Sequence, residues 1–129
     1  MGERMSSRCS GILIVENDNE SRESLKDFFE LEGYVTHTAT NGKEALKVLE
    51  TIDEPGVILL DLMMPEMNGW EFLEARKTLG SSAKVPVVIL TSTSTTQIQS
   101  LQPNSYIRKP VDLTELFKVV QNFCGGPSA

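Results

Sequence analysis

Short runs of branched apolar residues alternate along this chain with segments of helical periodicity, and that alternation constrains the fold more than any other feature. The most apolar runs, 11–15, 57–60 and 85–90, are continuous and typical of strands buried on both faces of a parallel sheet. Residues 34–39 and 105–108 mix apolar and polar side chains, which suits strands at or near a sheet edge. The sequence therefore predicts five strands.

Segments with helical periodicity separate these runs. Asn41, Asn68 and Asp112 each precede a glutamate by three residues, a spacing that predicts an N-cap. The apolar residues of the predicted helices are Leu25, Phe28 and Phe29; Ala45, Leu46 and Leu49; Phe72 and Leu73; and Leu113, Leu116, Phe117 and Val120. A fourth helix over 95–103 is poor in apolar residues and shortened. Five strands alternating with five helices predict an α/β fold, a doubly wound five-stranded parallel sheet with the flavodoxin-like order 2-1-3-4-5.

The length of 129 residues accommodates one domain, which we place at 10–124, between a flexible leader at 1–9 and a flexible tail at 125–129. Acidic residues outnumber basic ones by 18 to 12, which disfavours binding to nucleic acid, because Lys and Arg provide most contacts to phosphate backbones. No apolar run is long enough to span a bilayer or to form a signal peptide, so we expect a cytoplasmic protein without membrane contact. For the same reason we do not expect a disulfide between Cys9 and Cys124.

Polar side chains follow four of the predicted strands at their carboxyl ends, where sites form in doubly wound sheets. These residues are Glu16, Asn17 and Asp18 after the first strand, Asp61 after the third, Thr91 and Ser92 after the fourth, and Lys109 after the fifth. A small dication such as Mg²⁺ can hold clustered carboxylates together. A carboxylate beside Mg²⁺ and a lysine can act as a nucleophile toward phosphorus, because both cations neutralise the incoming phosphoryl oxygens.

From Ser10 to Phe123 the sequence resembles the receiver domain of two-component response regulators, of the single-domain, CheY-like type. The motifs that carry the resemblance are residues 12–18 (ILIVEND), 60–69 (LDLMMPEMNG), 90–92 (LTS) and 109–110 (KP), in that order. The resemblance implies that Asp61 accepts a phosphoryl group from a histidine kinase, a phosphotransfer protein or a small phosphodonor. It also implies signalling by docking to a downstream protein, whose identity the sequence does not give.

The resemblance assigns roles to individual residues as well. Thr91, Ser92 and Lys109 would bind the phosphoryl group, Thr91 and Tyr106 would form the switch, and the Lys109–Pro110 peptide bond would be cis. Mg²⁺ would be held by Glu16, Asn17, Asp61 and the backbone carbonyl of Met63.

The sequence departs from the family pattern in two places. Receivers carry two adjacent acids after the first strand, the second of which contacts Mg²⁺, whereas this chain has Glu16 followed by Asn17. An amide oxygen can bind the metal but adds no charge, so we expect weaker Mg²⁺ binding. Lys109 follows Thr91 by 18 positions, about one helical turn fewer than is common in the family. The shorter segment is the predicted fourth helix, which belongs to the face through which receivers signal.

These departures leave a second function open, a degenerate receiver that binds its partner without phosphorylation. Asn17 also stands three residues before Glu20, which makes it a candidate cap for the first helix. A flavin-binding protein of the same fold would need a phosphate loop rich in hydroxyl groups or glycine after the first strand. The acidic residues at 16–18 argue against that alternative.

Overall fold

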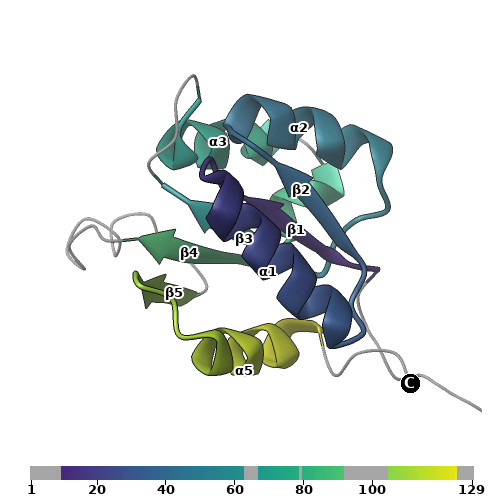
Figure 1. The fold of residues 1–129 in the computed structure, drawn as a ribbon. Coiled ribbons are helices and arrows are strands. Elements are labelled where there is room, and N and C mark those ends of the chain that lie inside the picture. The colour runs from purple at the N-terminus through teal and green to yellow at the C-terminus, as the bar shows by residue number, and fades with distance from the viewer. Residues whose placement is uncertain (1–9, 63–66, 79, 92–104, 125–129) are drawn as a thin grey trace, which may run out of the picture.

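A parallel five-stranded sheet forms the centre of the computed structural model, which describes residues 10–62, 67–78, 80–91 and 105–124 (Figure 1). The strands are β1 (Ile12–Val15), β2 (Thr36–Ala39), β3 (Val57–Asp61), β4 (Val87–Thr91) and β5 (Ser105–Arg108). The helices are α1 (Asn19–Leu31), α2 (Gly42–Thr51), α3 (Gly69–Ala75), α5 (Leu113–Cys124) and the short 3₁₀ helices η2 (Arg76–Thr78) and η3 (Gly80–Lys84). The strand order β2-β1-β3-β4-β5, with every pair parallel, confirms the predicted flavodoxin-like order. The predicted fourth helix, leader and tail lie outside the described residues.

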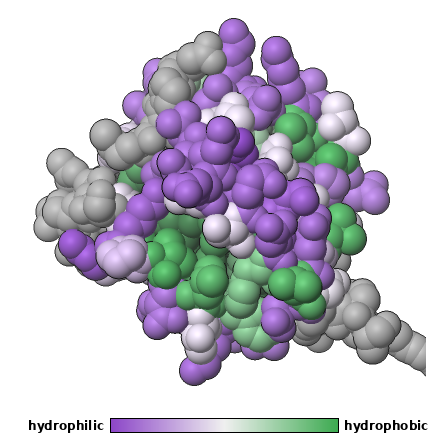
Figure 2. Space-filling view, viewed as in Figure 1, coloured by the Kyte–Doolittle hydropathy of each residue, from purple (hydrophilic) through white to green (hydrophobic). Residues whose placement is uncertain are grey.

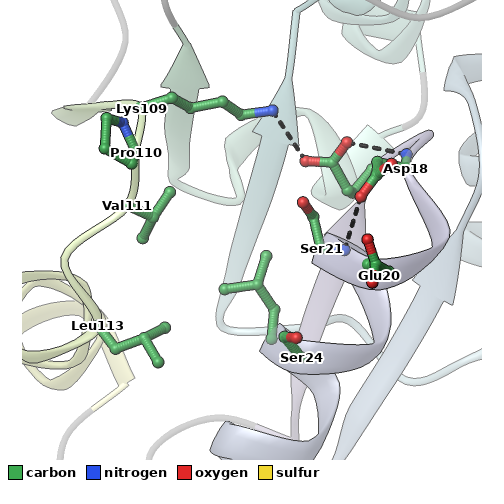
Figure 3. A pocket seen from close by; sticks show the side chains of 10 residues that line it. Asp18, Glu20, Ser21, Ser24, Lys109, Pro110, Val111 and Leu113 are labelled. Atoms are coloured by element: carbon green, nitrogen blue, oxygen red, sulfur yellow. Dashed lines mark hydrogen bonds and ion pairs between the residues drawn. The ribbon is translucent and has the colours of Figure 1, made fainter.

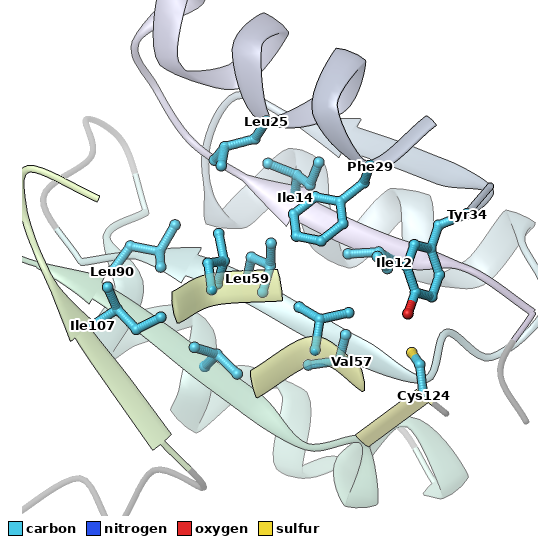
Figure 4. Packing of buried hydrophobic residues seen from close by; sticks show 13 residues of the cluster. Ile12, Ile14, Leu25, Phe29, Tyr34, Val57, Leu59, Leu90, Ile107 and Cys124 are labelled. Atoms are coloured by element: carbon cyan, nitrogen blue, oxygen red, sulfur yellow. The ribbon is translucent and has the colours of Figure 1, made fainter. Parts of the chain in front are cut away.

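Helices cover both faces of the sheet, α1 and α5 on one face and α2 and α3 on the other (Figure 1). Successive strand residues point to opposite faces, so Ile12 and Ile14 pack beneath α1 and α5, while Leu13 and Val15 pack beneath α2 and α3. All four side chains are fully buried, because a parallel sheet covered on both sides exposes neither face. Figure 4 shows the cluster beneath α1 and α5, where side chains of β1, β3, β4 and β5 meet those of both helices.

Three of the helices begin at the residues predicted to cap them. The side chains of Asn41, Asn68 and Asp112 each accept a hydrogen bond from the backbone N–H three residues later, at 2.8, 3.0 and 3.3 Å. At α3 the glutamate also returns a hydrogen bond to the backbone of Asn68 and completes a capping box. These caps fix the starts of α2, α3 and α5.

The predicted cap of α1 is wrong by one residue. Asp18, and not Asn17, is the N-cap, because its side chain accepts a hydrogen bond from Ser21 N–H at 2.9 Å. Asn17 lies before the helix, and its carbonyl oxygen accepts a hydrogen bond from Arg22 at 3.3 Å. The chain therefore turns at Asn17 and enters the helix at Asn19.

Two predictions about α5 also need correction. Leu113 was expected in the buried stripe but is 36% exposed, because it is the first residue of the helix and lines a surface groove beside α1. Cys124 is buried and disulfide-bonded, which contradicts the expectation of reduced cysteines. Parallel strands joined by helices bring the end of α5 back to the sheet edge at which β1 begins, and this proximity is not visible in the sequence. Cys9 lies outside the described residues.

The face shown in Figure 2 is mostly polar, with apolar side chains along the boundary between α1 and α5. Among the residues that the structure describes, the exposed large apolar side chains are those of Leu31, Val35 and Leu113. Within the described ranges, no helix is both long enough and apolar enough to cross a membrane.

Candidate functional site

Three charged side chains meet at the carboxyl edge of the sheet. Asp61 is the last residue of β3, Glu16 follows β1, and Lys109 follows β5. The Lys109 Nζ atom lies 3.1 Å from Glu16 Oε1 and 3.5 Å from Asp61 Oδ1. The carboxylate side chains are only 2% and 7% exposed, whereas that of the lysine is 30% exposed. We call these three residues the acid–lysine cluster. The structure thus brings together three of the four charged residues predicted at this edge, and the side chain of the fourth, Asp18, caps α1 instead.

Backbone hydrogen bonds hold the members of the cluster in place. The N–H of Glu16 donates to the carbonyl of Ala39 at 3.0 Å and so extends the pairing of β1 with β2. The N–H of Lys109 donates to the carbonyl of Thr91 at 2.9 Å and extends the pairing of β5 with β4. Asp61 is itself paired with β4. Because parallel strands end at one edge, residues that are distant in the sequence become neighbours there.

The two carboxylates determine the charge state of the lysine. Partial burial disfavours the ammonium form, but the hydrogen bond to Glu16 and the charge of Asp61 outweigh it and raise the pKa of Lys109 above its ordinary value. Lys109 is therefore a cation at neutral pH. The stabilisation from its raised pKa is fully present below the ordinary pKa and is lost as the pH rises through the folded-state pKa.

Glu16 is held at each of its acceptor groups. Its Oε1 accepts from Lys109, its Oε2 accepts from Asp18 N–H at 3.0 Å, and its backbone carbonyl accepts from Arg22 Nη1 at 3.0 Å. The sequence analysis did not single out Arg22, because an arginine one turn into a helix commonly faces solvent. An acidic turn just before the helix was the only signal that could have pointed to it.

The remaining predicted site residues lie around the cluster. Thr91 ends β4, next to β3, and is 1% exposed. Tyr106 is half-buried on β5 and packs against the core beneath α2 and α3. The Lys109–Pro110 peptide bond is cis. Two predicted site residues lie outside the described ranges, Ser92 and Met63.

The donor atoms of the cluster fit a Mg²⁺ ion. Glu16 and Asp61 supply buried carboxylate oxygens, and proteins commonly bind Mg²⁺ through one or two carboxylates together with water and substrate phosphate. Asn17 is exposed and supplies an amide in place of a further acid. Among the described residues, no three or more His, Cys, Asp and Glu side chains form a group that could hold a metal.

A surface groove of about 480 Å³ lies beside the cluster, between α1 and the segment that joins β5 to α5. In Figure 3, Lys109, Val111 and Leu113 line one wall, and Ser21 and Ser24 of α1 line the other. Glu16 and Lys109 belong both to the groove and to the cluster. The groove therefore connects the cluster with solvent.

The cap of α1 predicts a dependence of stability on pH. The hydrogen bond from the Ser21 N–H holds the pKa of Asp18 below its ordinary value, so its contribution is present above that ordinary value and is lost as the pH falls through the folded-state pKa. We expect Asp18→Ala to lower the melting temperature at neutral pH and to differ less from the wild type in acid. Asp18→Asn keeps a side-chain oxygen that can cap the helix, so its melting temperature should fall less than that of Asp18→Ala. Thermal unfolding followed by circular dichroism at both pH values tests this; equal losses at both would contradict it.

The strand order and the acid–lysine cluster together define a signal-receiver type of α/β domain. The family model of the response regulator receiver domain matches residues 12–121, and the chain belongs to this family. Receiver domains of this family are signalling modules that interact with histidine kinases or phosphotransfer proteins.

Individual relatives agree with this assignment. An uncharacterized 14.6 kDa protein of Leptolyngbya boryana is 34% identical over 117 residues, which are 88% of each chain. The regulatory protein AtoC of Escherichia coli is 36% identical over 114 residues, which are 85% of this chain but only 24% of AtoC. The crystallised chemotaxis protein CheY4 of Vibrio cholerae superimposes with a TM-score of 0.81 at 27% identity, covering 88% of this chain and 98% of that one. The chain thus matches one small relative along most of its length and about a quarter of a larger regulator.

Proposed function

We propose that this chain is a phosphoacceptor receiver, in which Asp61 takes a phosphoryl group from a phosphohistidine of a histidine kinase or phosphotransfer protein. The observation that carries the proposal is the position of Lys109 Nζ, within 3.5 Å of a buried Asp61 carboxylate oxygen at the carboxyl edge of the sheet. A buried carboxylate that faces a fixed cation is suited to receive an anionic group, because the cation offsets the charge that arrives.

In the proposed reaction, a carboxylate oxygen of Asp61 attacks phosphorus while the bond from phosphorus to the donor imidazole nitrogen breaks. A new P–O bond forms, and the imidazole leaves with the electron pair of the broken bond and takes up a proton. Lys109 pairs with one phosphoryl oxygen, and the hydroxyl groups of Thr91 and Ser92 bind others. Each contact to the charged group contributes about 1.5–3 kcal/mol, which limits how far phosphorylation shifts the equilibrium between inactive and active conformations. Thr91 and Tyr106 form the switch.

Glu16, Asn17, Asp61 and the Met63 carbonyl are the proposed ligands of Mg²⁺. When bound, the ion neutralises negative charge on the phosphoryl oxygens during transfer. The two buried carboxylates support this assignment, and the neutral Asn17 limits the affinity. We place the protein in the cytoplasm, with a downstream protein rather than nucleic acid or a membrane as its partner.

The charge at position 17 should determine the metal affinity. A further carboxylate close to a divalent cation adds several kcal/mol of attraction at an effective dielectric constant of about 20, part of which desolvation offsets. We therefore expect Asn17→Asp to tighten Mg²⁺ binding at least about tenfold. Trp70 fluorescence or calorimetry measures the affinity, and Asn122→Asp, the same change at an exposed position of α5, is the matched control. Equal affinities for Asn17→Asp and the wild type would exclude Asn17 as a ligand position.

Intact-mass measurement after incubation with acetyl phosphate and Mg²⁺ tests the proposed function. We expect one phosphoryl group on the wild type and none on Asp61→Asn. If the wild type takes up no phosphoryl group, and its partner binding is unchanged by Asp61→Asn and by EDTA, the chain is a phosphorylation-independent interaction module instead. The neutral Asn17 is the observation that favours this second function.

A further inference from the structure

Arg22 reaches back from the first turns of α1 to the segment that joins β1 to α1. Its Nη1 atom donates to the carbonyl oxygens of Glu16 and Asn17, at 3.0 and 3.3 Å, and its Nη2 atom donates to the side-chain oxygen of Asn19. A guanidinium group is planar and presents its N–H donors at fixed angles. Simultaneous contacts with three acceptors in one turn therefore hold that turn in a single conformation.

The turn held in this way carries a member of the acid–lysine cluster. The Glu16 carboxylate binds the Lys109 ammonium through one oxygen and the backbone N–H of Asp18 through the other. The Asn17 carbonyl and the Asp18 N–H belong to the same peptide group, so a rotation that broke the contact of this carbonyl with Arg22 would also displace the Asp18 N–H. Arg22 is thus connected to Asp61 by a continuous series of contacts through Glu16 and Lys109.

The formation of α1 does not depend on these contacts. Asp18 already caps the helix through Ser21 N–H, and Leu25 and Phe29 bury its apolar face. The hydrogen bonds of Arg22 act instead on the residues that precede the helix. An effect of Arg22 on the site can therefore be separated from an effect on the fold.

We infer that Arg22 is a positioning residue of the Asp61 site, which fixes the β1–α1 turn so that Glu16 holds the Lys109 ammonium beside Asp61. The inference rests on the proposed function, since the lysine so placed would bind the phosphoryl group. Without Arg22, Glu16 loses its fixed orientation, and the ammonium is held less closely to the phosphoacceptor. Phosphoryl binding then weakens although Arg22 itself does not contact the group.

Amide hydrogen exchange in the full chain without ligand tests the first half of the inference. We expect the Asp18 N–H, which donates to Glu16, to exchange about tenfold faster in Arg22→Met, because a hydrogen bond to a charged group contributes more than that factor to local stability. Lys26→Met removes a cation from the same helix, where its partner is Glu30 at 3.2 Å, and should leave this exchange unchanged. Unchanged exchange in Arg22→Met would overturn the inference whatever the function of the protein.

Titration with beryllofluoride and Mg²⁺, followed by Trp70 fluorescence, tests the second half. We expect Arg22→Met to weaken binding about tenfold and Lys26→Met to leave it unchanged. Arg22→Lys keeps the charge without the planar group, so it should restore little of the affinity; full restoration would overturn the inference, because charge alone would then suffice. This variant also serves if Arg22→Met does not fold.

A double-mutant cycle identifies the route of the effect. If Arg22 acts through Glu16, then Glu16→Gln should weaken binding, and adding Arg22→Met to it should weaken binding little further. Additive effects would contradict that route. A wild type that binds no beryllofluoride would contradict the proposed function, and the exchange measurement would still decide whether Arg22 positions the cluster.

Discussion

Lys109→Met should lose about 2 kcal/mol of stability at neutral pH, the contribution of a hydrogen bond between charged groups. The lysine lies within 3.5 Å of both Glu16 and Asp61, so its removal leaves two buried carboxylates without their shared cation. Two like charges that no cation offsets in a buried site repel one another and destabilise the folded protein. Acid removes negative charge and so relieves this repulsion, which means that the variant should regain stability as the pH falls.

Urea unfolding of the wild type and of Lys109→Met, at neutral and at mildly acidic pH, measures this difference in stability. Lys77→Met is the matched control, because Lys77 also pairs with a carboxylate, that of Glu74 at 2.6 Å, but both side chains are 71% exposed. Exposed pairs contribute little, so the control should stay within about 0.5 kcal/mol of the wild type at either pH. If Lys109→Met were as stable as the wild type at neutral pH, the lysine would not be the neutralising group of the cluster.

Gly69→Ala should lower stability by about 1–3 kcal/mol, the range for overpacking, and should also slow phosphoryl uptake. A Cβ atom at Gly69 would lie 2.8 Å from Leu62 Cα, 2.7 Å from Leu62 Cδ2 and 3.1 Å from the Asp61 carbonyl oxygen. Part of the obstruction is backbone, which cannot move aside by changing rotamer. The strain therefore falls on the segment that carries Asp61, the proposed phosphoacceptor, where Gly69 N–H also donates to the Leu62 carbonyl at 3.0 Å.

Gly80→Ala separates the two effects. Gly80 has a φ of +63°, so alanine there is strained by roughly 1–2 kcal/mol, yet among the described residues, its chain neighbours aside, no atom lies within 4 Å of the added Cβ. We expect this control to lose stability without any change in phosphoryl uptake. If both glycine variants slowed uptake equally, lower stability would explain the defect, and the close approach at Gly69 would have no particular role at the site.

The strand order and the acid–lysine cluster could be predicted because they depend on strong and simple signals. Continuous apolar runs are typical of buried strands, and parallel strands joined by helices bring Glu16, Asp61 and Lys109 to one edge. The caps at Asn41 and Asn68 could be predicted for a similar reason, since only one residue at each helix start has the required side chain and spacing.

Features that depend on choices between similar residues could not be predicted. Asn17 and Asp18 are both good capping residues, so the sequence does not distinguish between them; in the structure the Asp18 side chain accepts from Ser21 N–H, and the Asn17 carbonyl accepts from Arg22. The contacts of Arg22 itself follow from the path of the backbone between β1 and α1, which hydrophobic periodicity does not describe. The disulfide at Cys124 depends on where the last residue of α5 lies against the sheet, and the sequence does not give that position.

Chemical mapping of the phosphorylated residue tests the central claim most directly. Borohydride reduces an aspartyl phosphate to homoserine, so wild-type protein treated with acetyl phosphate and Mg²⁺, reduced, and then digested should yield one altered residue. The proposed function predicts homoserine at position 61 and unaltered Glu16 and Asp18. An unaltered Asp61 in the treated wild type, or an altered residue at either of the other two positions, would contradict it.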